Sequence, residues 1–92
     1  MDTPTVVQEL PDGLLQYGDR QYRCVRGSDV QRDGMYLEIS EGADFFGAQV
    51  AEVFFSDATG EFSLSLFVPD VPLPMVDWLI DRARQWLPPK DA

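Results

Sequence analysis

Apolar and polar residues alternate along two segments of the chain, and this pattern predicts β-strands. Residues 35–40 and 62–68 alternate most clearly. Because successive side chains of a strand point to opposite faces, each series marks the face that packs against a core. The residues predicted on that face are Met35, Leu37, Ile39, Phe62, Leu64, Leu66 and Val68.

Segments rich in β-branched and aromatic residues predict further strands, joined by tight turns. Gly18–Asp19 suits a two-residue hairpin turn, and residues 56–60 end in a glycine that can adopt a positive φ. The N-terminal residues 1–12 are expected to be loose or to form an edge strand. The further strands are predicted over residues 5–9, 14–17, 21–26 and 49–55.

After the last predicted strand the apolar spacing changes to three and four residues, which predicts an amphipathic helix over residues 72–87. Proline is tolerated in the first turn of a helix, and Pro88–Pro89 would end it. Residues 88–92 are expected to form a tail. The predicted buried stripe consists of Val76, Leu79, Ile80, Ala83 and Leu87.

Together these elements predict an α+β fold: an antiparallel meander of four to five strands with one C-terminal amphipathic helix packed on one face. The chain of 92 residues has the size of a single domain, residues 1–92. The helix stripe needs an apolar partner surface, which the alternating strands supply.

The sheet face away from the helix is the first candidate for function. Assigning Ala51, Val53 and Phe55 to the helix side leaves aromatic residues beside carboxylates on the open face. Exposed apolar patches tend to mark interaction sites. The alternative is that the N-terminal segment, or a second copy of the chain, covers these residues. The residues predicted on the open face are Tyr36, Glu38, Val50, Glu52, Phe54 and Phe67.

Trp78 and Trp86 lie on one side of the predicted helix, with Arg82 between them at four-residue steps. The guanidinium could stack between the two indoles in a cation–π arrangement. Alternatively, the tryptophans widen the packed face of the helix as boundary residues, which is a common role for Trp.

The composition excludes several kinds of site. The chain has no His, which excludes His-based catalysis and His-ligated metals, and its single cysteine, Cys24, excludes an internal disulfide. Cys24 is expected to be a small buried strand residue, although neighbours such as Arg23 and Arg26 could activate its thiol. The acidic N-terminus lacks the pattern of a signal peptide, and no apolar stretch is long enough to span a membrane. A cytoplasmic location is therefore expected.

The negative charge of the chain is unevenly distributed. There are 16 acidic residues against 7 basic ones, a net charge of −9. No Lys or Arg occurs from Asp33 to Asp81, whereas four arginines lie between positions 20 and 32. Such a charge opposes binding to nucleic acids and to anionic membranes. The acidic stretch is either a solvating surface, or a surface complementary to a basic partner, or a source of carboxylates for a metal or for acid–base chemistry.

Metal binding and catalysis are the weakest of these interpretations. Glu38 and Glu52 could face each other across two strands at a separation seen in glycosidases, but a chain of this size offers little room for a sugar cleft. The loop from Asp57 to Glu61 lacks the spacing of a calcium-binding loop. No metal, cofactor or catalytic residue is therefore expected.

The sequence thus predicts a non-enzymatic protein-binding module, most concretely a small acidic inhibitor such as a bacterial toxin-immunity protein that blocks a basic partner surface. This analogy uses size and charge alone. The alternative is a dimeric chaperone-like or structural adaptor using the same sheet face, and a remote alternative is a small carboxylate enzyme. Aromatic residues would anchor the partner, and carboxylates would pair with its Arg or Lys. The predicted contact residues are Tyr36, Glu38, Glu41, Asp44, Glu52, Phe54, Asp57, Glu61 and Phe67.

Overall fold

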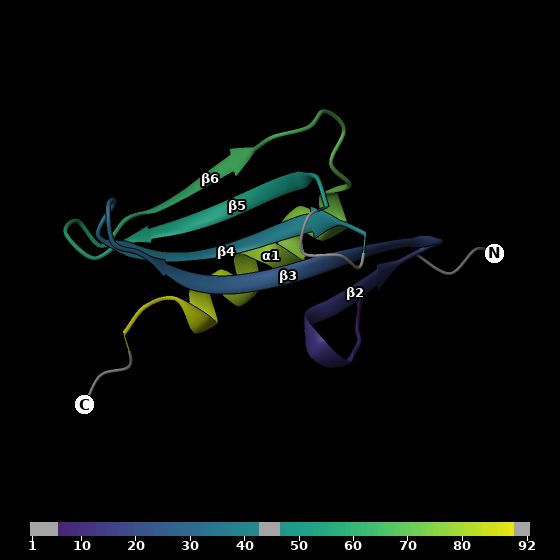
Figure 1. Cartoon of the computed structure of the whole chain (residues 1–92), viewed down its shortest axis with the longest axis horizontal. Coiled ribbons are helices and arrows are strands. Elements are labelled where there is room, and N and C mark those ends of the chain that lie inside the picture. The colour runs from purple at the N-terminus through teal and green to yellow at the C-terminus, as the bar shows by residue number, and fades with distance from the viewer. Residues whose placement is uncertain (1–5, 43–46, 90–92) are drawn as a thin grey trace.

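The computed structural model, which describes residues 6–42 and 47–89, contains one antiparallel sheet whose strands follow chain order (Figure 1). The strands are β1 (Gln8–Glu9), β2 (Leu14–Tyr17), β3 (Arg20–Asp29), β4 (Gly34–Glu41), β5 (Gln49–Ser56) and β6 (Phe62–Leu66). A 3-10 turn, Pro11–Gly13, joins β1 to β2, and helix α1 (Leu73–Trp86) follows β6. The α+β meander with one C-terminal helix is confirmed. It has six strands rather than four to five, because the two-residue β1 pairs with β2.

The buried side of α1 packs against β4 and β5, in the middle of the sheet (Figure 1). Met75, Leu79 and Ala83, four residues apart, are each 0% exposed, and Leu87 continues the series at 2%. The predicted stripe missed Met75 and included two residues that are only half-buried, at positions 76 and 80. The stripe is centred differently because the helix begins at Leu73 and already turns Met75 inward in its first turn. No described helix is long and apolar enough to cross a membrane.

A β-bulge between β4 and β5 changes the face on which Val50 lies. Ile39 pairs with Ala51, but Ser40 pairs with Gln49, which leaves Val50 as the extra residue of β5. Val50 and Ala51 therefore both point into the core, where they are 3% and 0% exposed. The prediction that Val50 lies on the open face is wrong for this reason.

Strand β6 is an edge of the sheet, and the prediction that its apolar side packs under the helix is wrong. Phe62, Leu64 and Leu66 remain 40%, 41% and 54% exposed, and Val68 just beyond the strand remains 36% exposed. A helix is about 10 Å wide and neighbouring strands lie about 4.8 Å apart, so one helix covers roughly two strands. Because α1 covers β4 and β5, the outermost strand is left outside its reach.

Gly34 provides a stability test, because a side chain at this position would collide with the backbone of β5. A Cβ there would overlap the carbonyl oxygen of Phe55, which cannot move without disturbing the strand. We expect Gly34→Ala to lower the free energy of unfolding by about 2 kcal/mol or more, measured by chemical denaturation.

Gly27→Ala is the matched control. A Cβ at Gly27 would meet the hydroxyl oxygen of Tyr36 at 2.6 Å, and that side-chain end can shift. Gly27→Ala is therefore expected to lower the free energy of unfolding by less than Gly34→Ala does. Equal stability of the Gly34 variant and the wild type would contradict the register of β4 and β5.

Candidate protein-binding face

The strand register determines which side chains share the open face, the side of the sheet away from α1. Tyr36 of β4 lies opposite Phe54 of β5, and Glu38 lies opposite Glu52. Each of these pairs is continued by a serine on β6. The open face therefore carries an aromatic row and, directly beside it, an acidic row. All four residues are half-buried, and these four are the predicted contact residues that the fold brings together.

Both aromatic rings of the open face lie across a glycine. Tyr36 pairs with Gly27 of β3, and a Cβ at Gly27 would meet the phenol ring. A Cβ at Gly34 would meet the tip of the Phe54 ring at 2.5 Å. The missing side chains let the rings lie down on the sheet, a pairing that compensates for glycine in a strand. Each ring thereby lies against the sheet while part of its surface stays exposed.

Arg32, in the turn between β3 and β4, folds back over this face. Its Nε donates to Asp29 Oδ2 at 2.6 Å, and Nη1 and Nη2 donate to the two carboxylate oxygens of Glu52 at 3.1 and 3.2 Å. The guanidinium carbon lies 4.2 Å from the centre of the Phe54 ring. The bonds to Glu52 and then to Asp29 raise the pKa of Arg32, and the bond from Arg32 lowers the pKa of Asp29. Two predicted contact residues, Glu52 and Phe54, thus already have a partner within the chain.

Glu38 and Glu52 carry like charges at directly opposed positions, an arrangement that destabilises a sheet. The prediction that they face each other across two strands is confirmed by the register. Arg32 offsets the charge of Glu52, whereas Glu38 accepts a hydrogen bond from the neutral side chain of Gln49, with Nε2 and Oε2 2.5 Å apart. Of the two carboxylates, Glu38 is therefore the one whose charge a partner can still neutralise.

Two adjoining turns add carboxylates at one end of the sheet. Asp57 and Glu61 are exposed in the turn between β5 and β6. The backbone N–H of Asp57 donates to the carbonyl of Asp33 at 3.0 Å, which holds this turn against the β3–β4 turn. We call Asp33, Asp57 and Glu61 the acidic turns. They border the open face at the end where Arg32 lies.

The remaining predicted contact residues are not part of this cluster. Glu41 is exposed at the opposite end of β4. Phe67 is 48% exposed just beyond β6. Asp44 lies outside the described residues.

Sequence reasoning missed the parts played by Arg32, Gly27 and Gly34, because the strands predicted over residues 21–26 and 35–40 left residues 27–34 between them as a connection. In the structure β3 continues to Asp29, and only residues 30–33 form the turn. Charge was the available signal. Arg32 is the last basic residue before the acidic stretch, and a guanidinium in that position favours a carboxylate as its partner.

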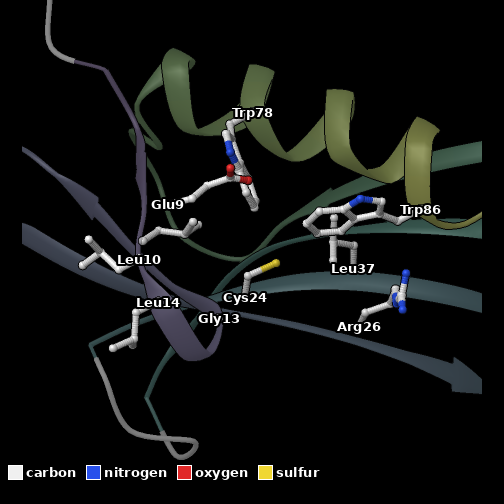
Figure 2. A pocket seen from close by; sticks show the side chains of 10 residues that line it. Glu9, Leu10, Gly13, Leu14, Cys24, Arg26, Leu37, Trp78 and Trp86 are labelled. Atoms are coloured by element: carbon white, nitrogen blue, oxygen red, sulfur yellow. The ribbon is translucent and has the colours of Figure 1, made fainter.

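A pocket of about 530 Å³ opens on the other side of the sheet, between α1 and strands β1 to β3 (Figure 2). Trp78 and Trp86 of α1 line one wall, and Cys24 and Arg26 of β3 line the floor. The two indoles meet edge to face, with ring centres 6.2 Å apart. The Arg26 guanidinium carbon lies 6.0 Å from the Trp86 ring. The pocket is thus aromatic with one cation at its side.

Arg82 stacks with both indoles and also ties α1 to β1. Its guanidinium carbon lies 5.4 Å from the Trp78 ring and 6.0 Å from the Trp86 ring. Its Nε donates to Glu9 at 2.8 Å, and this hydrogen bond lowers the pKa of Glu9. Arg82 thus contacts both indoles, as the stacking interpretation predicted, but it does not separate them, because the two rings meet edge to face. Trp78 also packs against the core, so the boundary role applies to it as well.

Cys24 forms part of the pocket floor and is not poised for reaction. Burial raises the pKa of its thiol to about 12, and the nearby carboxylates of Glu9 and Glu38 add to the shift. The reactive form of cysteine is the thiolate, so such a thiol is a weak nucleophile at neutral pH. Within residues 6–42 and 47–89, no three acidic or Cys side chains lie close enough to hold a metal ion.

Comparison of the chain with protein-family models, curated proteins and solved structures finds no match. Function therefore has to be inferred from the surfaces described above.

Arg32→Ala tests whether this guanidinium holds the open face together. Its loss leaves Glu38 and Glu52 opposed with no cation bound to Glu52, and we expect the free energy of unfolding to fall by about 1 kcal/mol. The loss should shrink when the same change is made in a Glu52→Gln background, because the repulsion is then absent. Denaturant titration of the wild type, the two single variants and the double variant measures the loss in free energy of unfolding in each background. Equal losses in both backgrounds would contradict a direct Arg32–Glu52 interaction.

Glu9→Gln tests the tie between β1 and α1 through its pH dependence. Because the folded pKa of Glu9 is lowered, the ion pair with Arg82 stabilises the fold above the ordinary glutamate pKa and is lost as the pH falls through the lowered value. The variant should be less stable than the wild type at pH 7, by less than about 1 kcal/mol for an exposed pair. The difference should shrink as the pH falls from 7 to below the ordinary glutamate pKa, and it should vanish once Glu9 is protonated in the folded state as well. Thermal melts across this range measure it, and a pH-independent difference would contradict the assignment.

Proposed function

We propose that the protein is a non-enzymatic module that binds a basic protein on its open face and acidic turns. The most concrete form is a small cytoplasmic inhibitor of the toxin-immunity type. The observation that supports it most is the placement of the aromatic row of Tyr36 and Phe54 directly beside the acidic row of Glu38 and Glu52. Such a surface combines apolar anchors with charges that select the partner.

Different parts of this surface would contribute to different stages of binding. The exposed carboxylates of the acidic turns would attract a basic partner from a distance and raise the rate of association. A partner arginine reaching Glu38 would repeat there the interaction that Arg32 makes with Glu52, including contact with a neighbouring ring. Tyr36, which lies beside Glu38 on β4, is the ring available for that contact, because Arg32 already covers part of Phe54.

The competing functions fit this face less well. If two copies paired through their open faces, as in the adaptor hypothesis, the acidic rows of both chains would be brought together and would repel each other. A carboxylate enzyme would need Glu52 free for proton transfer or attack. Both oxygens of Glu52 are hydrogen-bonded to Arg32 instead.

The experiment is capture of binding proteins from the native host on immobilised protein, followed by mass spectrometry and kinetic measurement with the purified partner. We expect a basic protein whose association rate falls about tenfold or more between low and high salt, because exposed charges are screened. Glu38→Gln and Asp57→Asn should each slow association or weaken binding.

Asp77→Asn is the control, because Asp77 is an exposed carboxylate on α1, away from the open face, and its loss changes the net charge equally. It should bind like the wild type. If all three substitutions weaken binding to the same extent, the open face is not the binding site. If the partner binds equally well at low and high salt, the electrostatic part of the proposal fails.

A further inference from the structure

The β6 edge carries apolar side chains on a segment without charge. Every residue from Glu61 to Asp70 is exposed, and no charged residue lies between these two. Phe62, Leu64 and Leu66 project on the helix side, because they share that side with the buried partners to which they pair on β5. In a chain with a net charge of −9, such a stretch is the least suited to contact with water.

The backbone of β6 also has hydrogen-bonding groups directed away from the sheet. Ser56 N–H donates to the Glu61 carbonyl at 3.0 Å, and Phe67 N–H donates to the Val50 carbonyl at 2.9 Å. In an antiparallel pair, every second residue turns both its N–H and its C=O to the neighbour. The odd-numbered residues of this strand therefore bond to β5, and the N–H and C=O groups of Phe62, Leu64 and Leu66 point to the open edge.

The opposite edge of the sheet does not share these properties. Strand β1 is two residues long, and one of them is Glu9, which pairs with Arg82. Short strands and charges are the usual protection of a sheet edge against further pairing. Neither protection is present on β6. In Figure 1 this strand forms the outer border of the sheet.

We propose that β6 pairs antiparallel with β6 of a second copy, about a two-fold axis at Leu64, to form a continuous sheet through both chains. The strand is self-complementary in this register. Leu64 lies opposite Leu64 of the second copy, and Phe62 lies opposite Leu66. All of these residues have outward-directed backbone groups, so each pair can exchange two hydrogen bonds. On the helix side the apolar side chains then meet across the axis, and on the open face serine meets serine.

The environment of the edge supports a second copy as the occupant. Two chains of like charge repel each other, and β6 is an edge strand without charge, through which they can approach closely. A groove of about 180 Å³ already lies between α1 and this strand, lined by Val53, Phe62, Leu64 and Ile80, with Arg84 at its side. In the proposed dimer the grooves of both chains lie beside one continuous apolar surface, formed by Phe62, Leu64 and Leu66 of the two copies. This inference does not depend on the proposed function, because the open face stays accessible in both copies.

The contact is small, so the dimer is expected to be weak and reversible, with a dissociation constant in the micromolar range or above. Its dependence on salt distinguishes it from the binding of a basic partner. Screening reduces the repulsion between the two acidic chains, so added salt should strengthen the dimer. The same salt should weaken binding of a basic protein at the open face.

The test is sedimentation equilibrium of the purified full chain, without partner, over a concentration series at low and high salt. We expect a monomer–dimer equilibrium for the wild type. Leu64→Lys should raise the dissociation constant of the dimer at least about tenfold, because it places two like charges opposite each other on the axis. Leu64 is 41% exposed, so this change should leave the monomer folded, which circular dichroism verifies. Ala58→Lys, an equal charge change in the exposed β5–β6 turn, is the control and should dimerise like the wild type.

Amide hydrogen exchange locates the interface. In the monomer the amides of Ser63 and Ser65 should be protected by β5, while those of Phe62, Leu64 and Leu66 exchange. At dimerising concentrations all five should be protected. A monomer at every concentration and salt would overturn the proposal. So would a dimer in which these three amides still exchange, because the copies would then meet at another surface. Retention of the dimer by Leu64→Lys would also overturn it.

Discussion

One helix of 14 residues has to cover one side of a six-stranded sheet, and this mismatch determines the rest of the molecule. The helix is about 21 Å long and 10 Å wide, whereas six strands span about 24 Å between the outermost axes. It therefore seals the middle of the sheet, where Leu37, Ile39 and Ala51 are 0% exposed. The open face, the β6 edge and the pocket beside β1 to β3 are the parts it leaves uncovered.

Local pattern was sufficient to predict the elements of this fold. The alternation in β4, the turn at Gly18 and the change to helical spacing after Pro72 each depend on a few adjacent residues. The structure reproduces most of them within one or two residues, but β3 is longer than expected and the strand predicted over residues 5–9 begins only at Gln8. What local pattern does not contain is the position of an element relative to the others. Strands β4 and β6 alternate equally well, yet only β4 lies under the helix.

On the open face, too, local pattern predicted some features and missed those that depend on how the strands are placed relative to one another. The alternation along each strand predicted that Tyr36, Phe54, Glu38 and Glu52 share one face, and that Glu38 could face Glu52. The pairing of Tyr36 with Phe54 follows from the register. The prediction failed for Val50, because the extra residue at a bulge interrupts the alternation between the two faces of β5. Arg32 was missed because a residue of the β3–β4 turn reaches past β4 to Glu52 on β5, and neither sequence distance nor spacing indicates such a contact. The alternation of side chains predicts the face of a residue only along a stretch of strand pairing that contains no bulge.

The rings that lie across glycines have a consequence for how tightly the open face can bind. Side chains that must be immobilised on association lose rotamer entropy, which opposes complex formation. Tyr36 is held against Gly27, and Phe54 is held between Gly34 and Arg32, before any partner arrives. Part of their rotamer freedom has therefore already been lost on folding. The glycines of β3 and β4 thus do more than admit a close contact: they make this surface preorganised, so that a complementary protein meets rings already in one conformation.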